Sequence, residues 1–242
     1  MRWLGVFLLT AAIAPGAGAA DEFFIPTAAQ RQGADGQWWN TEVWISNTLA
    51  TPGGYAAVFL PASGNSNLDA LETEPPLAEI APRATVFRND LVPEGQTGAL
   101  RLVVTPGVLV YSRTANAAGK LSSAQGMPAF SRSAAIRPGE LASLVGLRRT
   151  PQYRTTIGLL NPSREAGAVT IRLFSQKGDI VHDVTYQLPP GAALQLDEVL
   201  HAFGVVRGEH MRAELSGTVP FLAYASVVDA RSGAPTLILP QR

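Results

Sequence analysis

The chain has 242 residues, of which 46% are hydrophobic and 16% charged, a composition typical of a folded protein and not of a disordered one. Its 19 basic and 19 acidic side chains cancel, which removes the electrostatic attraction to nucleic acid or to an anionic membrane surface. Cysteine is absent, so disulfides, thiolate metal sites and cysteine nucleophiles are excluded. The 23 glycines and 18 prolines interrupt short apolar runs, a pattern that predicts an all-β fold with many turns.

Residues 1–20 have the pattern of a secretory signal peptide. Arg2 supplies the positive charge, residues 3–14 are apolar, and small residues precede a cleavage site after Ala19 or Ala20. The apolar run of about 12 residues is shorter than the ~20 that cross a bilayer, although an uncleaved N-terminal anchor is the alternative. No cysteine follows the run, which excludes a bacterial lipid anchor. We therefore expect a periplasmic or extracellular protein with no membrane attachment after signal cleavage.

The stretch Trp38–Asn47 is the clearest strand signal in the chain. It follows a short β-run at 23–25 and a hairpin-type turn at Asp35-Gly36. Because side chains alternate between the two faces of a strand, Val43 and Ile45 share one face, which we predict to be the core face. Every second residue from Trp38 to Ser46 lies on the opposite face. The predicted core face holds Trp39, Thr41, Val43, Ile45 and Asn47, and the opposite face holds Trp38, Asn40, Glu42, Trp44 and Ser46.

Further strands are predicted after this stretch, separated by glycine and proline turns. They cover residues 55–60, 99–104 and 108–114, and the last two form a hairpin across Thr105-Pro106-Gly107. Residues 62–76 are polar and acidic and are expected to form a long loop. One helical turn is expected at 89–95.

The second half of the chain repeats the pattern of the first. In Tyr153–Asn161, as in Trp38–Asn47, an aromatic residue, Thr, apolar residues and Asn fall at the same alternate positions. Tyr224 occupies the place of Tyr111 in the closing hairpin. The second half also contains one short helix at 198–203, for which we predict Asp197 as the N-cap and Gly204 as the left-handed stop. The strands predicted there cover 141–147, 153–161, 169–174, 184–188, 192–196, 211–215, 221–228 and 236–239.

These repeated units of about 110 residues match the size of a seven-strand β-sandwich. We therefore predict an all-β fold of two tandem β-sandwich modules, at 21–130 and 140–242, joined by a linker at 131–139. One short helix belongs to the second module. Strand count and spacing fit an immunoglobulin-like and a jelly-roll-like sandwich equally well.

The candidate ligand-binding residues are Trp38, Asn40, Glu42 and Trp44, which share the face opposite the predicted core. Exposed aromatic rings beside polar groups bind sugars or protein partners. The alternative is that Trp44 packs against the second module, where Gly158 at the matching position leaves room, or that the strand is buried on both faces.

Other chemistry-bearing residues lack the spacing that a catalytic or metal site requires. The acidic run from Asp69 to Glu79 has no calcium-loop pattern and is predicted to be a solvated loop. The chain contains no serine-hydrolase elbow, phosphate-binding loop or dinucleotide motif, and we predict no metal and no cofactor. Arg113 is expected to form a structural ion pair or to lie at a strand end. His182, His201 and His210 have no metal-ligand spacing, and Arg148, Arg149 and Arg154 are expected to form a solvated face.

An ordered set of strand and turn motifs runs through both halves. It consists of Phe24-Ile25-Pro26, Trp39-x-Thr41-x-Val43-x-Ile45-x-Asn47, Phe59-Leu60-Pro61, Tyr111-Ser112-Arg113-Thr114 and Ser226-Val227-Val228-Asp229 followed by Ser232-Gly233-x-Pro235-Thr236. With these motifs the chain resembles an uncharacterised duplicated β-sandwich module of secreted bacterial proteins, often found as the C-terminal part of larger extracellular chains. The resemblance covers nearly the whole mature chain. It implies a duplicated β fold and brings no activity and no site residues.

The sequence favours a non-catalytic exported protein, with an interaction or structural role, that binds a protein or polysaccharide partner at the cell envelope or outside the cell. Duplication, neutral charge and the lack of catalytic motifs support this interpretation. The first alternative is a carbohydrate-binding module that uses Trp38 and Trp44. A hydrolase that uses carboxylates and a histidine of the second module is a weaker alternative, since paired carboxylates need not be close in sequence.

Overall fold

The computed structural model describes residues 20–242 apart from 34–35 and 119–120, so the signal peptide predicted at 1–20 lies almost wholly outside the described residues. The fold is all-β, as predicted, with 59% strand and 6% helix. Within the described residues, no helix has the length and apolar character needed to cross a bilayer.

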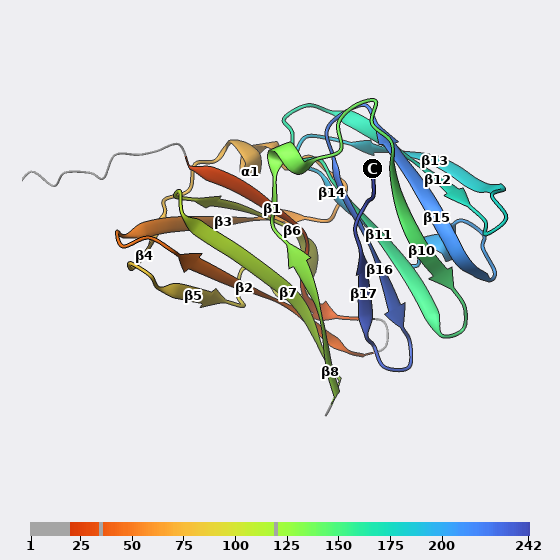
Figure 1. The fold of residues 1–242 in the computed structure, drawn as a ribbon, viewed down its shortest axis with the longest axis horizontal. Helices are drawn as coiled ribbons and strands as arrows, with labels where there is room; N and C mark the ends of the chain where they lie inside the picture. Colours follow the sequence, from red (N-terminus) through yellow and green to blue (C-terminus); the bar gives the residue numbers. More distant parts are fainter. Residues whose placement is uncertain (1–19, 34–35, 119–120) are drawn as a thin grey trace, which may run out of the picture.

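The first half of the chain forms one continuous sheet that is bent into two layers (Figure 1). One layer has the order β4-β3-β6-β1 and the other has the order β5-β2-β7-β8. The end of β1 joins the layers, because residues 30–32 pair with β2 at 38–40. The strands are β1 (Asp21–Gln32), β2 (Trp38–Asn47), β3 (Gly53–Pro61), β4 (Ala78–Ile80), β5 (Thr85–Arg88), β6 (Gln96–Val104), β7 (Val108–Ala118) and β8 (Leu121–Pro128).

The second half forms two separate sheets whose strand orders, β10-β15-β12-β13 and β14-β11-β16-β17, match the layers of the first half. In each half the second strand pairs with the fifth and the third with the sixth, as in immunoglobulin sandwiches, but the first and seventh strands have exchanged sheets. The strands are β10 (Ala142–Arg149), β11 (Tyr153–Leu160), β12 (Gly167–Phe174), β13 (Ile180–Leu188), β14 (Ala193–Leu196), β15 (Gly208–Gly217), β16 (Leu222–Asp229) and β17 (Pro235–Ile238).

Side-chain alternation places the cores where the sequence pattern predicts them. In β2, Thr41, Val43, Ile45 and Asn47 are buried, and the residues between them are only partly buried. Because successive strand residues point to opposite faces, one apolar set faces the interior and the other remains on the outer face. Trp39 departs from the pattern: it is only half-buried, because it lines a cleft between the two halves of the chain.

Two matched asparagines, Asn47 and Asn161, form the same hydrogen bonds at the end of the second strand in each half. The side-chain oxygen of Asn47 accepts a hydrogen bond from the backbone of Leu49 (3.0 Å), and that of Asn161 accepts one from Ser163 (2.9 Å). Each side-chain nitrogen donates to carbonyls of its own loop and of the turn after the fourth strand. The acceptors are residues 51, 80 and 81 for Asn47, and residues 165, 188 and 189 for Asn161.

We expect Asn47→Ala and Asn161→Ala each to lower the free energy of unfolding by about 1–2 kcal/mol, since buried carbonyls lose their donor. Urea denaturation followed by circular dichroism measures the change. Asn65→Ala is the control: Asn65 is exposed on a turn, and its replacement should stay within about 0.5 kcal/mol. A loss of stability in only one of the two buried variants would show that the matched asparagines contribute unequally to the free energy of unfolding.

The helices differ from the prediction in three places. Residues 62–76 are not only loop, because α1 (Leu68–Glu72) lies within them and buries Leu71 completely. Residues 89–95 form no helix, since Gly95 at φ 79° closes a turn directly into β6. The predicted second-half helix exists as α2 (Val199–Ala202), but Glu198 and not Asp197 is its N-cap residue. Gly204, at φ 77°, ends it as predicted.

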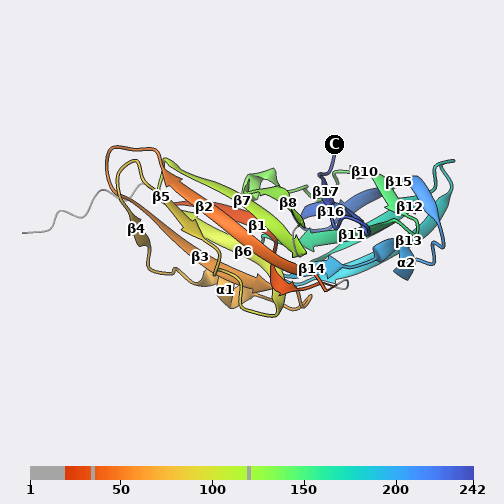
Figure 2. The ribbon, with the colours of Figure 1, turned by 90° about the horizontal axis from the view of Figure 1, so that it is seen from below.

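The two halves lie side by side along the long axis and share an apolar contact (Figure 2). The segment between the last strand of one half and the first of the other contains β9 (Phe130–Ser131), which pairs with β1, and the 3-10 helix η1 (Arg132–Ala134). Ile136, just beyond it, bridges to Phe221. The buried cluster shared by both halves is Phe24, Leu60, Leu71, Ala99, Ala135, Leu160, Ala193 and Leu222.

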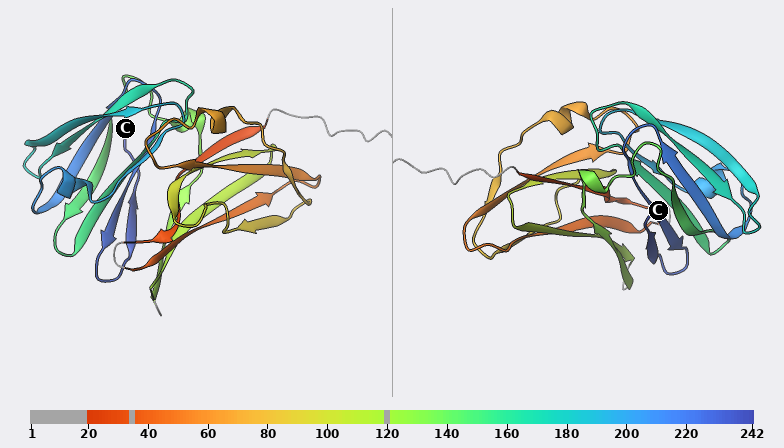
Figure 3. Two further views of the ribbon diagram at one scale, coloured as in Figure 1. Left: turned by 180° about the vertical axis from the view of Figure 1, so that it is seen from behind. Right: turned by 45° about the horizontal axis from the view of Figure 1, so that its top comes forward.

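Polar contacts hold the halves together on both sides of this cluster. Figure 3 shows α1 beside the second half, where Asn67 donates from its backbone to Pro190 (2.9 Å) and from its side chain to Gly191 (3.0 Å). On the other side, β8 runs beside β17, and Ser123 donates to the carbonyl of Gly233 (3.1 Å). These contacts fix the relative position of the two outer sheet faces described next.

Candidate functional site

The layers β5-β2-β7 and β14-β11-β16 present matched outer faces. In the first half, Trp44 lies between Phe87 on β5 and Tyr111 on β7. The register is the same in the second half, where Gly158 lies between Gln195 on β14 and Tyr224 on β16. In the next row, Glu42 and Arg113 correspond to Thr156 and Ser226.

The first-half face carries an aromatic row, defined here as Phe87, Trp44 and Tyr111. The ring centroids of Trp44 and Phe87 are 5.1 Å apart with planes at 51°, and those of Trp44 and Tyr111 are 5.6 Å apart at 41°. Phe87 and Tyr111 are 46% and 55% exposed. The row is therefore an open apolar surface in which the central ring is held by its two neighbours.

An ion pair borders the aromatic row. Arg113 Nε donates to Glu42 Oε2 at 2.5 Å, and its guanidinium lies 5.2 Å from the centre of the Trp44 ring. The hydrogen bond that Arg113 donates to Glu42 raises the pKa of Arg113, so the charge over the ring is permanent. Arg113 thus forms the ion pair that we predicted, and the pair places a cation against the face of Trp44.

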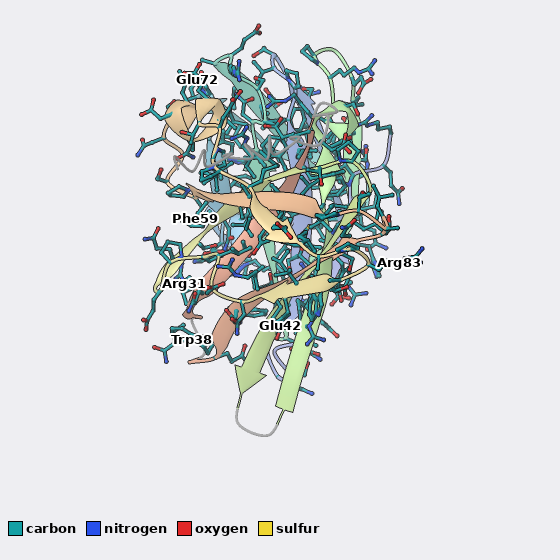
Figure 4. All side chains as sticks on the ribbon, turned by 90° about the vertical axis from the view of Figure 1, so that its left-hand side faces the viewer. Arg31, Trp38, Glu42, Phe59, Glu72 and Arg83 are labelled. Atoms are coloured by element: carbon teal, nitrogen blue, oxygen red, sulfur yellow. The ribbon has the colours of Figure 1, made fainter. Side chains whose placement is uncertain are left out.

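The residues predicted from the sequence all lie on the face away from the core, but they are not one cluster. Glu42 and Trp44 meet through Arg113, whereas Trp38, 39% exposed, lies at the far end of β2 near Arg31 (Figure 4). Asn40 is the residue between them on this face. The aromatic rings that contact Trp44 come from its own half.

The space left by Gly158 is filled by Tyr224 and not by Trp44. A Cβ atom on Gly158 would lie 1.9 Å from Cε1 of Tyr224, so the ring lies directly over the glycine. The first half covers Tyr224, which is 3% exposed, and burial raises the pKa of its hydroxyl. The neutral hydroxyl donates to Gln195 Oε1 at 3.3 Å.

Beside Tyr224 the two halves leave a cleft of about 300 Å³, which we call the inter-half cleft. Its floor is the outer face of β14-β11-β16, and its opposite wall comes from β1, β2, β6, β7 and β8 of the first half. The floor includes Arg154, Thr156, Asp197, Ser226 and Val228, and the wall includes Thr27, Arg31, Trp39, Thr97, Thr114 and Gln125.

Hydrogen bonds fix the polar groups of the cleft. Gln195 Nε2 and Thr156 Oγ1 both donate to Asp197 Oδ1, at 2.8 and 3.2 Å. Gln195 Oε1 in turn accepts from Thr97 Oγ1 at 3.1 Å, across the two halves. This network explains why Asp197 does not cap α2: its carboxylate is held by the sheet face. Sequence reasoning missed the cleft because its walls come from distant segments.

The remaining candidates have structural contacts. The ring of His182 stacks on Phe203 with centroids 4.1 Å apart, and His201 Nδ1 lies 2.8 Å from Arg149 Nη2. Arg148 lies over the Tyr153 ring, and Arg154 lines the cleft, so these arginines do not form the solvated face expected from the sequence. In the ranges that the structure describes, no group of three or more His, Asp or Glu side chains could hold a metal ion.

Comparison with known proteins gives no family for this chain. No protein-family model matches it, and no curated protein matches its sequence. Its function is therefore inferred from the two faces themselves: an open aromatic row on one half, and a hydrogen-bonded polar cleft between the halves.

Proposed function

We propose that the chain is a non-catalytic exported binding protein whose aromatic row binds a β-structured protein partner at the cell envelope or outside the cell. One observation carries the proposal: the matched face of the second half already contacts a β-module, namely the first half of the same chain, through Tyr224 and Gln195. The same face of this sandwich therefore serves as a contact surface once within the chain, and the first-half copy is open.

The composition of the row supports a protein partner. Trp, Tyr, Phe and Arg are enriched in the buried centres of protein interfaces, and here Trp44 is surrounded by Phe87, Tyr111 and Arg113. Leu109, exposed on the same strand as Tyr111, extends the apolar surface. Such exposed apolar side chains gathered in one patch mark interaction sites on soluble proteins.

The ring geometry favours a protein over a polysaccharide at this surface. A sugar chain stacks on rings that present parallel faces, but the planes in the row are tilted by 41° and 51°. Trp38, the second tryptophan of the carbohydrate hypothesis, lies apart from the row. The row is better matched to the irregular side chains of a protein.

Site-specific photo-crosslinking tests the proposal. A photoreactive residue at Tyr111 should capture a discrete protein from an envelope extract, whereas one at Gln187, exposed on β13, should not. With the captured protein purified, Trp44→Ala should weaken binding about 30-fold or more, as expected for a central interface tryptophan. Sedimentation of the purified chain shows whether a second copy is the partner.

Gln187→Ala is the matched control and should leave the affinity unchanged. Circular dichroism and thermal melting of Trp44→Ala establish that a loss of binding is not a loss of folding. Identical capture from positions 111 and 187, or full binding by folded Trp44→Ala, would contradict the proposed role of the row.

A further inference from the structure

The inter-half cleft has the size and position of a small-ligand site. Ligand sites of about 300–1,000 Å³ occur preferentially where two modules meet, and this cleft of about 300 Å³ lies between two halves of the chain. Its volume suits a ligand of one or two rings. Its lining includes none of the three residues of the aromatic row, so its occupant is independent of the proposed protein partner.

The charges of the cleft favour a neutral ligand. Arg31 and Arg154 are balanced by Asp197 and Glu198 among the described lining residues. An anionic ligand would face both carboxylates, and a cationic ligand would face both guanidinium groups. A neutral ligand with many hydroxyl groups meets donors and acceptors on the same wall, because each hydroxyl both donates and accepts.

The uncharged lining groups have the same character. Hydroxyl and amide side chains dominate the walls, and Trp39 supplies one aromatic ring against which the C–H face of a sugar can pack. The neutral hydroxyl of Tyr224, whose pKa is raised by burial, also lines the cleft. The hydroxyl and amide groups are Thr27, Thr97, Thr114, Thr156, Ser226, Gln32, Gln125 and Gln195.

The polar groups are held in place before any ligand arrives. Gln195 and Thr156 both bond to one oxygen of Asp197, Oδ1, and Gln195 is itself held by Thr97 and Tyr224. Supporting hydrogen bonds of this kind reduce the ordering cost of binding. Both bonds engage Oδ1, and in the site proposed below the second oxygen, Oδ2, accepts from a ligand hydroxyl.

Backbone strain at the edge of the cleft supports the same assignment. Glu198 has φ 47°, a left-handed conformation that non-glycine residues rarely adopt. The strained residue lines both the inter-half cleft and a neighbouring pocket of about 160 Å³, which also share Arg154. Such strain gathers at ligand-binding sites because the surrounding structure imposes it.

From these observations we propose that the inter-half cleft binds a neutral saccharide of one or two rings, with Asp197 and Thr156 bonding its hydroxyl groups and Trp39 contacting its apolar face. Calorimetric titration of the purified protein with glucose, galactose, mannose, N-acetylglucosamine, maltose and cellobiose tests this. At least one should bind saturably with a Kd in the millimolar range or below. Tryptophan fluorescence of a Trp38→Phe/Trp44→Phe variant, in which Trp39 is the remaining tryptophan outside the predicted signal peptide, should change on binding.

Asp197→Asn should weaken the binding of that sugar about 10- to 100-fold, the effect of losing a hydrogen bond to a charged group. Thr156→Val is a second variant, and it should weaken binding with the fold intact. Asp183→Asn is the control: Asp183 lies on β13 in an exposed ion pair with Arg172, and its replacement should leave the affinity unchanged.

The proposal would be overturned if no sugar of the panel binds, or if a sugar binds folded Asp197→Asn and Thr156→Val as well as it binds the wild type. It would also be overturned if a charged probe, inorganic phosphate or zwitterionic glycine, binds in place of the sugars. Trp44→Ala separates the cleft from the aromatic row. It should keep sugar binding while it loses the protein partner.

Discussion

Gly158→Ala is expected to lower the free energy of unfolding by about 3 kcal/mol, near the upper end of the cost of overpacking a core. The added Cβ would lie 1.9 Å from Cε1 and 2.3 Å from Cζ of Tyr224. The ring is held against movement, because the first half covers it and it packs into the core cluster of that half. The substitution therefore strains the contact between the halves. Urea denaturation of the purified variant measures the loss.

Gly126→Ala is the matched control. Gly126 also faces a tyrosine, but a Cβ there would be 3.3 Å from the hydroxyl of Tyr111, whose ring is exposed and can move. We expect no loss of stability in this variant. The double variant Gly158→Ala/Tyr224→Ala should lose less than the sum of its single changes, since the clash is absent. Wild-type stability of Gly158→Ala would mean that the Tyr224 ring does not lie fixed over β11.

The sequence predicts those parts of the fold that depend on local periodicity. The alternation in Trp38–Asn47 assigns Val43 and Ile45 to the core and Glu42 and Trp44 to the outer face, and the structure agrees. The all-β class follows from the same alternation, repeated between turns. Local patterns succeed here because the pleat of a strand fixes the side of every residue once one side is known.

Predictions fail where a distant segment decides the outcome. Helix α1 is stabilised by Leu71, which packs into the apolar cluster between the halves. No local pattern in the acidic stretch reveals this contact. Asp197 is a residue type that commonly caps helices, yet its carboxylate accepts hydrogen bonds from Gln195 and Thr156 instead. Both errors arise from tertiary contacts that override a local preference.

The candidate site shows the same division. The alternation of side chains along the strand places Trp44 on the outer face. Exposure of that face depends on whether another module contacts it, and the two halves differ in this respect. From the sequence, the matched residue Gly158 leaves room in which Trp44 could pack. In the structure this space is filled by Tyr224 from the neighbouring strand. The inter-half cleft is built from segments as distant as residues 27 and 235, so only the arrangement of the halves reveals it.

Glu22→Gln is expected to lower the free energy of unfolding by about 2–3 kcal/mol, because it leaves a buried cation without its carboxylate. Glu22 accepts from Arg101 Nε at 2.6 Å and from Arg132 Nη2 at 2.5 Å, and Arg101 is only 8% exposed. Arg101 keeps the carbonyls of Ala70 and Thr73 as acceptors, which holds the loss below that of a fully stranded charge. Thermal and urea denaturation at neutral pH measure the effect.

Glu42→Gln shows whether burial of the remaining arginine, and not the length of the ion pair, decides this loss. Its partner Arg113 is also 2.5 Å away but is 43% exposed, so water can solvate the guanidinium once the carboxylate is removed. The cost should therefore stay within about 1 kcal/mol, the range of exposed pairs. Equal losses in the two variants would mean that pair geometry outweighs burial. A larger loss in Glu22→Gln would show that burial of the arginine decides the cost. The Glu22 network also reaches the second half, because Arg132 donates to the carbonyl of Pro162.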